Sequence, residues 1–184
     1  MSSAAADHAV ADDVGLSLIE LIVVVVVVGI LSSVVVMILV NSWTTQQDVN
    51  STTVATNEGQ VYASSIEKAV RNADAIQLNG AQTQLLVRTT LGGALTCQAF
   101  KIEPVDALNP ARGDAAYLAT GASATTWSGP SIRESVDPVA ASYFTKSGKV
   151  ITYAFQIETE ASPVTFDGEV SARNNLSETG APCW

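Results

Sequence analysis

The sequence predicts an α+β protein in which a long N-terminal helix, half transmembrane and half amphipathic, packs on an antiparallel β-sheet. Three observations support this fold class. An apolar run occupies residues 16–40, and apolar residues recur at helical spacing between residues 54 and 73. Beyond residue 74 the pattern changes to short alternating stretches separated by turn residues, which is typical of antiparallel strands. The 184 residues suffice for one membrane segment and one modest domain.

The first expected element is a membrane-spanning helix from Leu16 to Val40. Glu20 is its only ionisable side chain. At the rise of an α-helix the segment is about 37 Å long, enough to cross a bilayer with some tilt. It is longer than the apolar core of a secretory signal peptide, and the following NSWTTQQ lacks a small-x-small cleavage pattern. We therefore expect the segment to remain in the membrane.

The second expected element is an amphipathic helix that continues in the direction of the first. The polar stretch after Val40, NSWTTQQDVNSTT, is poor in helix formers. Farther on, Gly59 weakens the helix without breaking it. The helix is expected to end near Asn72 or Ala73. Its apolar face is predicted to comprise Val54, Val61, Tyr62, Ile66, Ala69, Val70 and Ala73.

Short strands are expected to form the sheet. The predicted strands are Ala75–Leu78, Gln84–Thr90, Leu95–Ile102, Tyr117–Ala119, Lys149–Thr159 and Val164–Ala172. Turns are predicted at Asn79-Gly80, Gly92-Gly93 and Ser147-Gly148. Residues 122–138, which are rich in Ser, Thr, Gly and Pro, are expected to form a loop.

The charge balance argues against a surface that grips nucleic acid. The formal net charge is −9, with 18 acidic and 9 basic residues. A nucleic-acid-binding domain carries the opposite sign, so we expect no such partner. Charged residues make up only 15% of the chain. A polar, weakly charged surface of this kind suits an extracellular, β-rich protein.

Two cysteines, Cys97 and Cys183, are the candidates for a disulfide. An even count in a chain with an export segment indicates a disulfide formed outside the cytoplasm. Closing so long a loop is worth roughly 4 kcal/mol in the chain-entropy model. The alternative is two unrelated buried thiols.

The sequence offers no set of catalytic or cofactor-binding residues. His8, the only histidine, lies in the N-terminal stretch before the apolar run, so a triad or a histidine metal site is not expected. Glu158 and Glu160 are predicted to share one face of a strand, where carboxylates could bind calcium. A solvated strand edge explains them more simply. We expect neither catalysis, nor a metal, nor a cofactor.

Residues 15–31, GLSLIELIVVVVVVGIL, resemble the N-terminal signature of type IV pilins and type II secretion pseudopilins. The resemblance implies that the membrane-bound prepilin peptidase cuts between Gly15 and Leu16 and that the new α-amine of Leu16 is N-methylated. Glu20 then falls at the fifth mature position and Gly29 at the fourteenth, as in the family. Two departures are an acidic leader where the family has a basic one, and Met37 where many major pilins have proline.

The resemblance also implies a role for the glutamate. In a filament, Glu20 of one subunit can pair with the α-amine of Leu16 on a neighbour, and the charge-assisted pair sets the register. The alternative is a carboxylate that reaches water at the membrane interface. A carboxylate within the membrane costs several kcal/mol, so it is a functional candidate by default.

The implied organisation is a leader (1–15), an assembly helix (16–40) and an extracytoplasmic head (41–184). The implied partners are the prepilin peptidase, other pilin or pseudopilin subunits, the assembly platform and the membrane. The protein would reside in the inner membrane as a single-pass protein with its head outside, then in a pilus or pseudopilus. The short strands and C-terminal cysteine resemble minor pilins. A different reading is a membrane-anchored extracytoplasmic binding domain or enzyme that never assembles.

Overall fold

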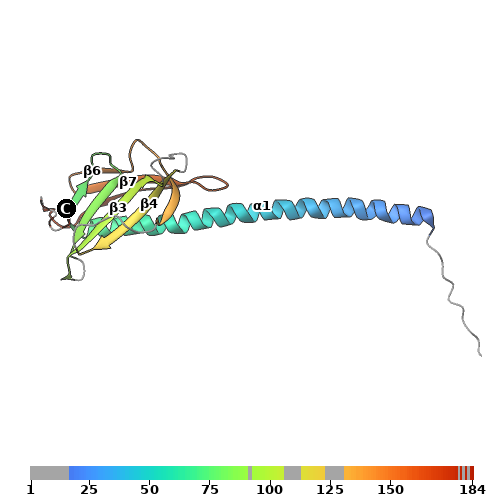
Figure 1. Ribbon diagram of the computed structural model, residues 1–184, viewed down its shortest axis with the longest axis horizontal. Helices are drawn as coiled ribbons and strands as arrows, with labels where there is room; N and C mark the ends of the chain where they lie inside the picture. The colour runs from blue at the N-terminus through green and yellow to red at the C-terminus, as the bar shows by residue number, and fades with distance from the viewer. Residues whose placement is uncertain are drawn as a thin grey trace, which may run out of the picture. The chain divides into compact units, whose positions relative to one another are not determined.

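The computed structural model describes residues 17–90, 93–105, 113–122, 131–177, 179, 181, 183 and 184. The chain divides into two compact units, residues 1–45 and 46–184, and each is described by itself. The expected α+β class is confirmed. One long helix, α1 (Leu18–Arg71), is followed in the described chain by eight antiparallel strands (Figure 1).

The polar stretch after Val40 belongs to α1 despite its poor helix formers. Its hydroxyl side chains donate to carbonyl groups three or four residues earlier, so their polar atoms are satisfied within the helix. Thr45 bonds to the Asn41 carbonyl at 2.9 Å, and Thr52 bonds to the Asp48 carbonyl at 2.8 Å. The expected helix end is confirmed, since α1 stops at Arg71.

The strands are more numerous than the sequence predicts. They are β1 (Ala73–Leu78), β2 (Gln84–Thr89), β3 (Thr96–Pro104), β4 (Asp114–Gly121), β5 (Arg133–Pro138), β6 (Phe144–Ser147), β7 (Val150–Ile157) and β8 (Val164–Ser171). The sheet order is β1-β2-β3-β4-β5-β7-β6, and β8 pairs with β7. The six predicted strands correspond to β1, β2, β3, β4, β7 and β8; of these, β1, β3 and β4 are longer than the predicted strands, while β2, β7 and β8 are shorter.

The prediction that residues 122–138 form a loop is wrong at its C-terminal end, which is β5. Asp114 pairs with Val136 whereas Ala115 pairs with Glu134, so Ser135 is an extra residue in a β-bulge. Its φ of 59° is left-handed, a conformation that one type of β-bulge uses at the inserted residue. Of the same range, residues 123–130 lie outside the described residues.

The turn at Ser147-Gly148 lies where the sequence predicts it, whereas the turn at Asn79-Gly80 is longer than predicted. β6 and β7 join at the predicted Ser147-Gly148, where Gly148 has a φ of 59° and Ser147 pairs with Val150. That geometry matches a two-residue hairpin with glycine first. The turn at Asn79-Gly80 instead extends over residues 79–83. The Asn79 side chain holds it by accepting hydrogen bonds from the Thr83 and Gln84 amides at 2.9 and 3.0 Å. Of the Gly92-Gly93 turn, only Gly93 lies within the described residues.

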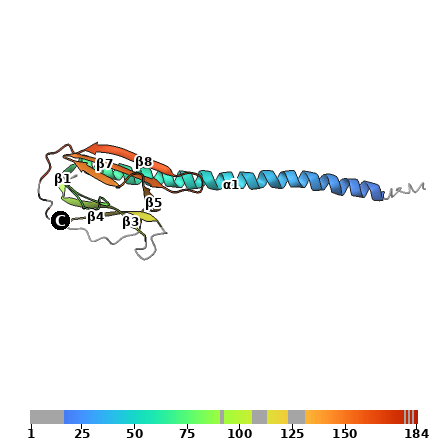
Figure 2. The same ribbon diagram turned by 90° about the horizontal axis from the view of Figure 1, so that it is seen from above.

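The sheet curls around the C-terminal part of α1. Figure 2 shows β7 and β8 along one side of this part of the helix and β3 and β4 on the opposite side. The curl brings β6 back to the β1–β2 hairpin, where the Phe144 amide donates to the Gln82 carbonyl at 3.1 Å. Lys146 Nζ donates to the Ile76 carbonyl at 2.7 Å. The helix thereby has sheet on both sides.

Tyr62 of α1 is the centre of the core. Its ring, 1% exposed, meets Phe100 of β3 and Phe155 of β7 edge to face, with centroids 5.9 and 5.6 Å apart. Its hydroxyl donates to the Lys101 carbonyl at 3.3 Å. Burying an aromatic ring in such contacts contributes on the order of 2–3 kcal/mol. One residue thus holds both halves of the curled sheet to the helix.

The predicted apolar face of the helix is correct in part. Tyr62, Ile66, Ala69 and Val70 are buried as expected, and Ala73 is buried as the first residue of β1. Val54 and Val61 are instead 37% and 59% exposed. The remaining buried positions of the helix are taken by small residues, namely Ala55, Gly59 and Ala63. Close approach of helix and sheet favours small side chains over valine there.

Candidate functional site

The predicted processing site lies outside the described residues. Gly15 and Leu16 fall in residues 1–16, as does His8. Leader cleavage and N-methylation at Leu16 therefore stay predictions. Of the predicted charge pair, the structure describes Glu20.

Glu20 lies in the first turn of α1, with its side chain exposed. The Ser17 carbonyl accepts hydrogen bonds from the amides of Glu20 and Leu21 at 2.9 and 3.1 Å, so the helix begins directly after Ser17. Ser17 and Glu20 have the S-x-x-E spacing of a capping box, and a carboxylate near a helix N-terminus is stabilised by the helix dipole. This local role was not among the sequence-based expectations, although the spacing is visible in the sequence.

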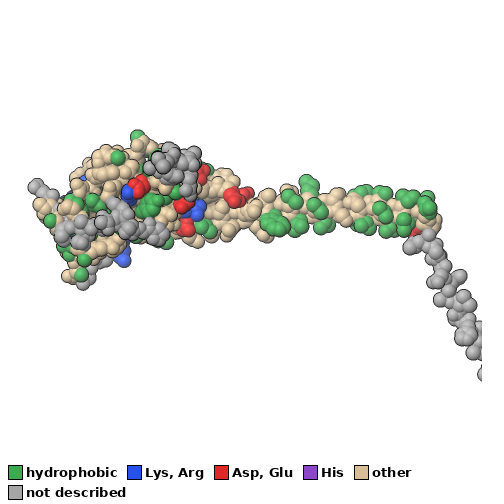
Figure 3. All heavy atoms as spheres, viewed as in Figure 1, with side chains coloured by type: hydrophobic (Ala, Val, Ile, Leu, Met, Phe, Trp, Pro, Cys, Tyr) green, Lys and Arg blue, Asp and Glu red, His purple; other side chains and the backbone are tan. Residues whose placement is uncertain are grey.

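The described helix surface that follows Glu20 is predominantly apolar. All large hydrophobic side chains from Leu18 to Val40 are 48–77% exposed. In Figure 3 hydrophobic side chains cover the N-terminal part of α1, while most acidic and basic side chains lie farther along the chain. The most apolar window of α1 has a mean hydropathy of 3.3 and is not buried by the rest of the protein. A helix apolar on all sides is compatible with a single-pass membrane anchor.

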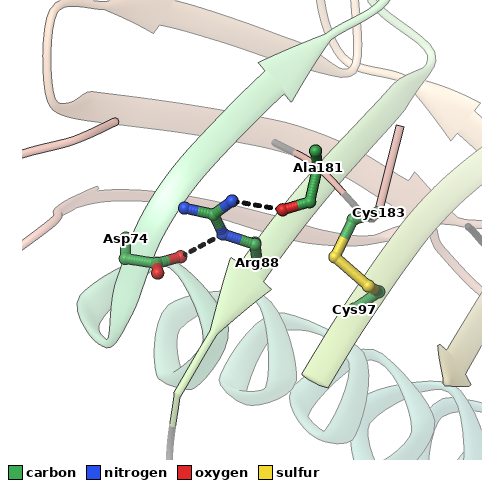
Figure 4. Close-up of a disulfide and its surroundings, with 5 residues drawn as sticks. All are labelled: Asp74, Arg88, Cys97, Ala181 and Cys183. Atoms are coloured by element: carbon green, nitrogen blue, oxygen red, sulfur yellow. Dashed lines mark hydrogen bonds and ion pairs between the residues drawn. A yellow bond between two sulfur atoms is a disulfide. The ribbon is translucent and has the colours of Figure 1, made fainter. Parts of the chain in front are cut away.

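The predicted disulfide is present in the structure and joins β3 to the end of the chain. Cys97 and Cys183 are bonded with their Cα atoms 5.4 Å apart, and both are buried. Figure 4 shows Arg88 of β2 close to this bond, where it donates to the Asp74 carboxylate at 2.9 Å and to the Ala181 carbonyl at 2.6 Å. A single guanidinium therefore connects β1, β2 and the chain end.

The segment after β8, residues 172–184, is called the C-terminal strap from here on. Its described residues lie along β1 and the end of α1. The bonds are from the Arg173 amide to the Arg71 carbonyl (3.2 Å), from Asn174 Nδ2 to the Ala73 carbonyl (3.2 Å) and from the Ser177 amide to the Asp74 carbonyl (2.6 Å). Because the strap occupies backbone acceptors of the edge strand β1, it covers an edge that other chains could otherwise pair with.

Besides the Tyr62 hydroxyl, two carboxylates of α1 make polar contacts with the sheet. Glu58 pairs with Arg133 of β5 at 3.1 Å, and Glu67 accepts a hydrogen bond from the Tyr153 hydroxyl of β7 at 2.8 Å. Burial, and then the hydrogen bond to Glu67, raise the pKa of Tyr153 above its ordinary value. The Tyr143 pKa is raised in the same way, by burial and by the 2.5 Å hydrogen bond to Asp114. These contacts hold elements of the fold together. The carboxylates of Asp114 and Glu67 accept hydrogen bonds from neutral tyrosines, and that of Glu58 pairs with a cation.

The described residues contain no group of three or more His, Cys, Asp or Glu side chains placed to hold a metal ion. The prediction that Glu158 and Glu160 share a strand face is wrong, because β7 ends at Ile157 and both residues follow it. Glu158 is exposed and its carboxylate accepts a long, 3.5 Å hydrogen bond from Gln156. Glu158 and Glu160 are both exposed to solvent, which agrees with solvated carboxylates rather than a calcium site.

Comparison of this chain with protein-family models, with curated proteins and with solved structures gives no match in any of the three.

Proposed function

We propose that this chain is a structural subunit of a type IV pilus or pseudopilus. In this proposal the prepilin peptidase cuts after Gly15, and the mature protein is assembled from the inner membrane through its N-terminal helix. The single observation that carries the proposal is Glu20, the one carboxylate in an apolar helix surface that the rest of the chain leaves uncovered. A long helix followed by a disulfide-bonded antiparallel head is consistent with it.

Glu20 lies in the first turn of the apolar helix. A charged side chain costs about 3 kcal/mol at the centre of a membrane on insertion scales and less near a helix end, so the cost at Glu20 lies below that value unless assembly buries it among neighbouring helices. After cleavage, a positive α-amine at Leu16 on a neighbouring subunit can offset that cost, and only in the correct register. Residues 18–40 supply the apolar surface for packing against neighbouring helices. Assembly would then depend on processing, because the amine does not exist before the cut.

The competing role for Glu20 is local, as the third residue of a capping box. Glutamine serves a capping box as well as glutamate does, but it carries no charge. Glu20→Gln therefore separates the two roles. We expect the variant to insert and to be cleaved normally, and to be absent from filaments in cells that express the assembly machinery. Asp48→Asn, which removes the next carboxylate along α1, is the matched control and should assemble.

Two results would overturn the proposal. Normal incorporation of Glu20→Gln would show that the charge is not used between subunits. N-terminal sequencing of protein coexpressed with a prepilin peptidase would show Leu16 as the first residue if processing occurs. Recovery of an intact Met1 or Ser2 would instead favour an anchored domain that does not assemble.

A further inference from the structure

Two hollows flank Lys68 near the C-terminal end of α1. The first has a volume of about 240 Å³ and is lined mainly by polar side chains of α1, β2 and β3, among them Ser65, Thr89, Thr96 and Gln98. The second has a volume of about 260 Å³. Lys68 and Asn72 line both. The two hollows therefore adjoin at these residues. Together they are called the Lys68 recess, with the two hollows as its lobes, and they lie within the unit formed by residues 46–184.

The charged lobe has an excess of cations. It is lined by Lys68, Arg71 and Arg173 together with one carboxylate, Glu67. Arg71 pairs with Glu67 at 3.8 Å, and Glu67 also accepts from Tyr153. Within the described chain, the side chains of Lys68 and Arg173 make no ion pair or hydrogen bond. A third of the nine basic residues of a chain with net charge −9 thus gather at one recess.

Helix capping does not explain these cations. Lysine and arginine in a last helical turn commonly bind the free carbonyl groups there. In α1 three of these carbonyls, those of Lys68, Ala69 and Arg71, already have partners: Asn72 Nδ2 donates to the Lys68 carbonyl at 2.7 Å, and the Arg173 amide donates to the Arg71 carbonyl at 3.2 Å. The Asn72 amide occupies the Ala69 carbonyl at 3.2 Å. The ammonium and guanidinium groups are therefore free to bind a ligand.

The first lobe, which Lys68 also lines, supplies hydrogen-bonding groups of the kind that bind hydroxyls. Thr89 is only 3% exposed, yet its hydroxyl makes no hydrogen bond with another described residue. Among the described residues, the buried side-chain polar atom without a partner is Arg133 Nε, so the Thr89 hydroxyl oxygen is accessible from the recess that Thr89 lines, where a ligand hydroxyl can reach it. Gln98 and Thr96 add an amide and a hydroxyl beside it. This lobe can bind several hydroxyl groups at once.

We propose that the Lys68 recess binds an acidic saccharide. The carboxylate or sulfate of the sugar would pair with Lys68 and Arg173, and its hydroxyls would bind Thr89, Thr96 and Gln98. A nucleic acid fits less well. The cations form a compact cluster rather than a stripe, none of the described lining residues is aromatic and able to stack on a base, and the net charge repels a polyanion. The proposal does not depend on filament assembly.

The test uses the full chain in non-ionic detergent and a matched pair of sugars. Glucuronate and glucose differ by one carboxylate, so ligand-observed NMR should show saturable binding of glucuronate and much weaker binding of glucose. Lys68→Gln/Arg173→Gln should weaken glucuronate binding about tenfold, the scale of one or two lost charge-assisted hydrogen bonds. Lys101→Gln removes a charge outside the recess and is the control.

A second variant keeps the test valid if the double variant unfolds. Gln98→Ala should weaken glucuronate binding while leaving the melting temperature nearly unchanged. The proposal is overturned if glucuronate does not bind, if the control variant loses as much affinity as the double variant, or if sodium sulfate competes as well as the sugar. Tighter, salt-dependent binding of a thymidine oligonucleotide that needs Lys68 and Arg173 would replace it with a nucleic-acid site.

Discussion

Gly59 of α1 lies so close to Phe166 of β8 that a Cβ atom at position 59 would be 2.2 Å from the phenylalanine ring. Phe166 in turn stacks on Phe155, with ring centroids 5.2 Å apart. The glycine therefore has a packing function that outweighs its poor helix propensity. Because position 59 has no side chain, α1 can contact the ring of Phe166, which its stacking on Phe155 holds in place.

Gly59→Ala should destabilise the head, although alanine favours helix by about 1 kcal/mol in an exposed position. The ring of Phe166 must move away from Phe155, and overpacking of this kind costs about 1–3 kcal/mol. We expect a lower free energy of unfolding in urea. Gly29→Ala is the control, because nothing lies within 4 Å of the Cβ it would add. A stabilised Gly59→Ala protein would mean that the ring relaxes without cost.

Removing the disulfide should have the largest effect on stability. Cys97 and Cys183 are 86 residues apart, so their bond restricts a long loop in the unfolded chain. Cys97→Ala/Cys183→Ala should lower the free energy of unfolding by about 3–4 kcal/mol. Urea titrations with and without dithiothreitol measure this. The reductant should destabilise the parent protein and leave the double variant unchanged; equal sensitivity of the two proteins would contradict the prediction.

Stability should fall at alkaline pH because of Tyr143 and Tyr153. Burial and hydrogen bonds to carboxylates raise the pKa of both hydroxyls in the folded protein. The unfolded chain loses these protons near pH 10, while the folded protein keeps them to higher pH. Their contribution is therefore complete below about pH 9 and is lost progressively above pH 10.

The measurement is the free energy of unfolding from pH 7 to pH 11, for the parent protein and for Tyr143→Phe/Tyr153→Phe. Each lost hydrogen bond should lower stability at pH 7 by about 1 kcal/mol. Above pH 10 the parent should lose stability more steeply than the variant. Parallel curves would show that the two hydroxyls ionise at the same pH in both states.

The fold class was predictable because its main signals are local. The apolar run and the alternation in β7 and β8 are readable without knowing any partner. The β5 strand was not, since Arg133–Pro138 has little strand propensity and Ser135 sits in a bulge that only the pairing with β4 defines. The helix face was misjudged at Val54 and Val61 because closeness to the sheet, rather than hydrophobicity, selects Ala55 and Gly59.

Among the candidate sites, those with a local sequence signal could be predicted, and the one formed by distant residues could not. The disulfide could be anticipated from an even number of cysteines after a long apolar segment, and Glu20 from its isolation among apolar residues. The Lys68 recess could not, because Thr89 and Arg173 come together with the helix end only through the sheet and the C-terminal strap. Helical spacing alone would assign Lys68 to an ordinary solvated surface.

The C-terminal strap also determines when the head can finish folding. Asn174 bonds to Ala73, about a hundred residues earlier, and Cys183 completes the bond to Cys97. Contacts of such sequence separation form late, because the entropy of closing the intervening loop is lost before the contact forms. Until those residues arrive, β1 presents an unpaired edge. A chain whose C-terminal strap is not yet in place would therefore be open to strand exchange at β1 with another copy, and docking of residues 173–177 would end that period.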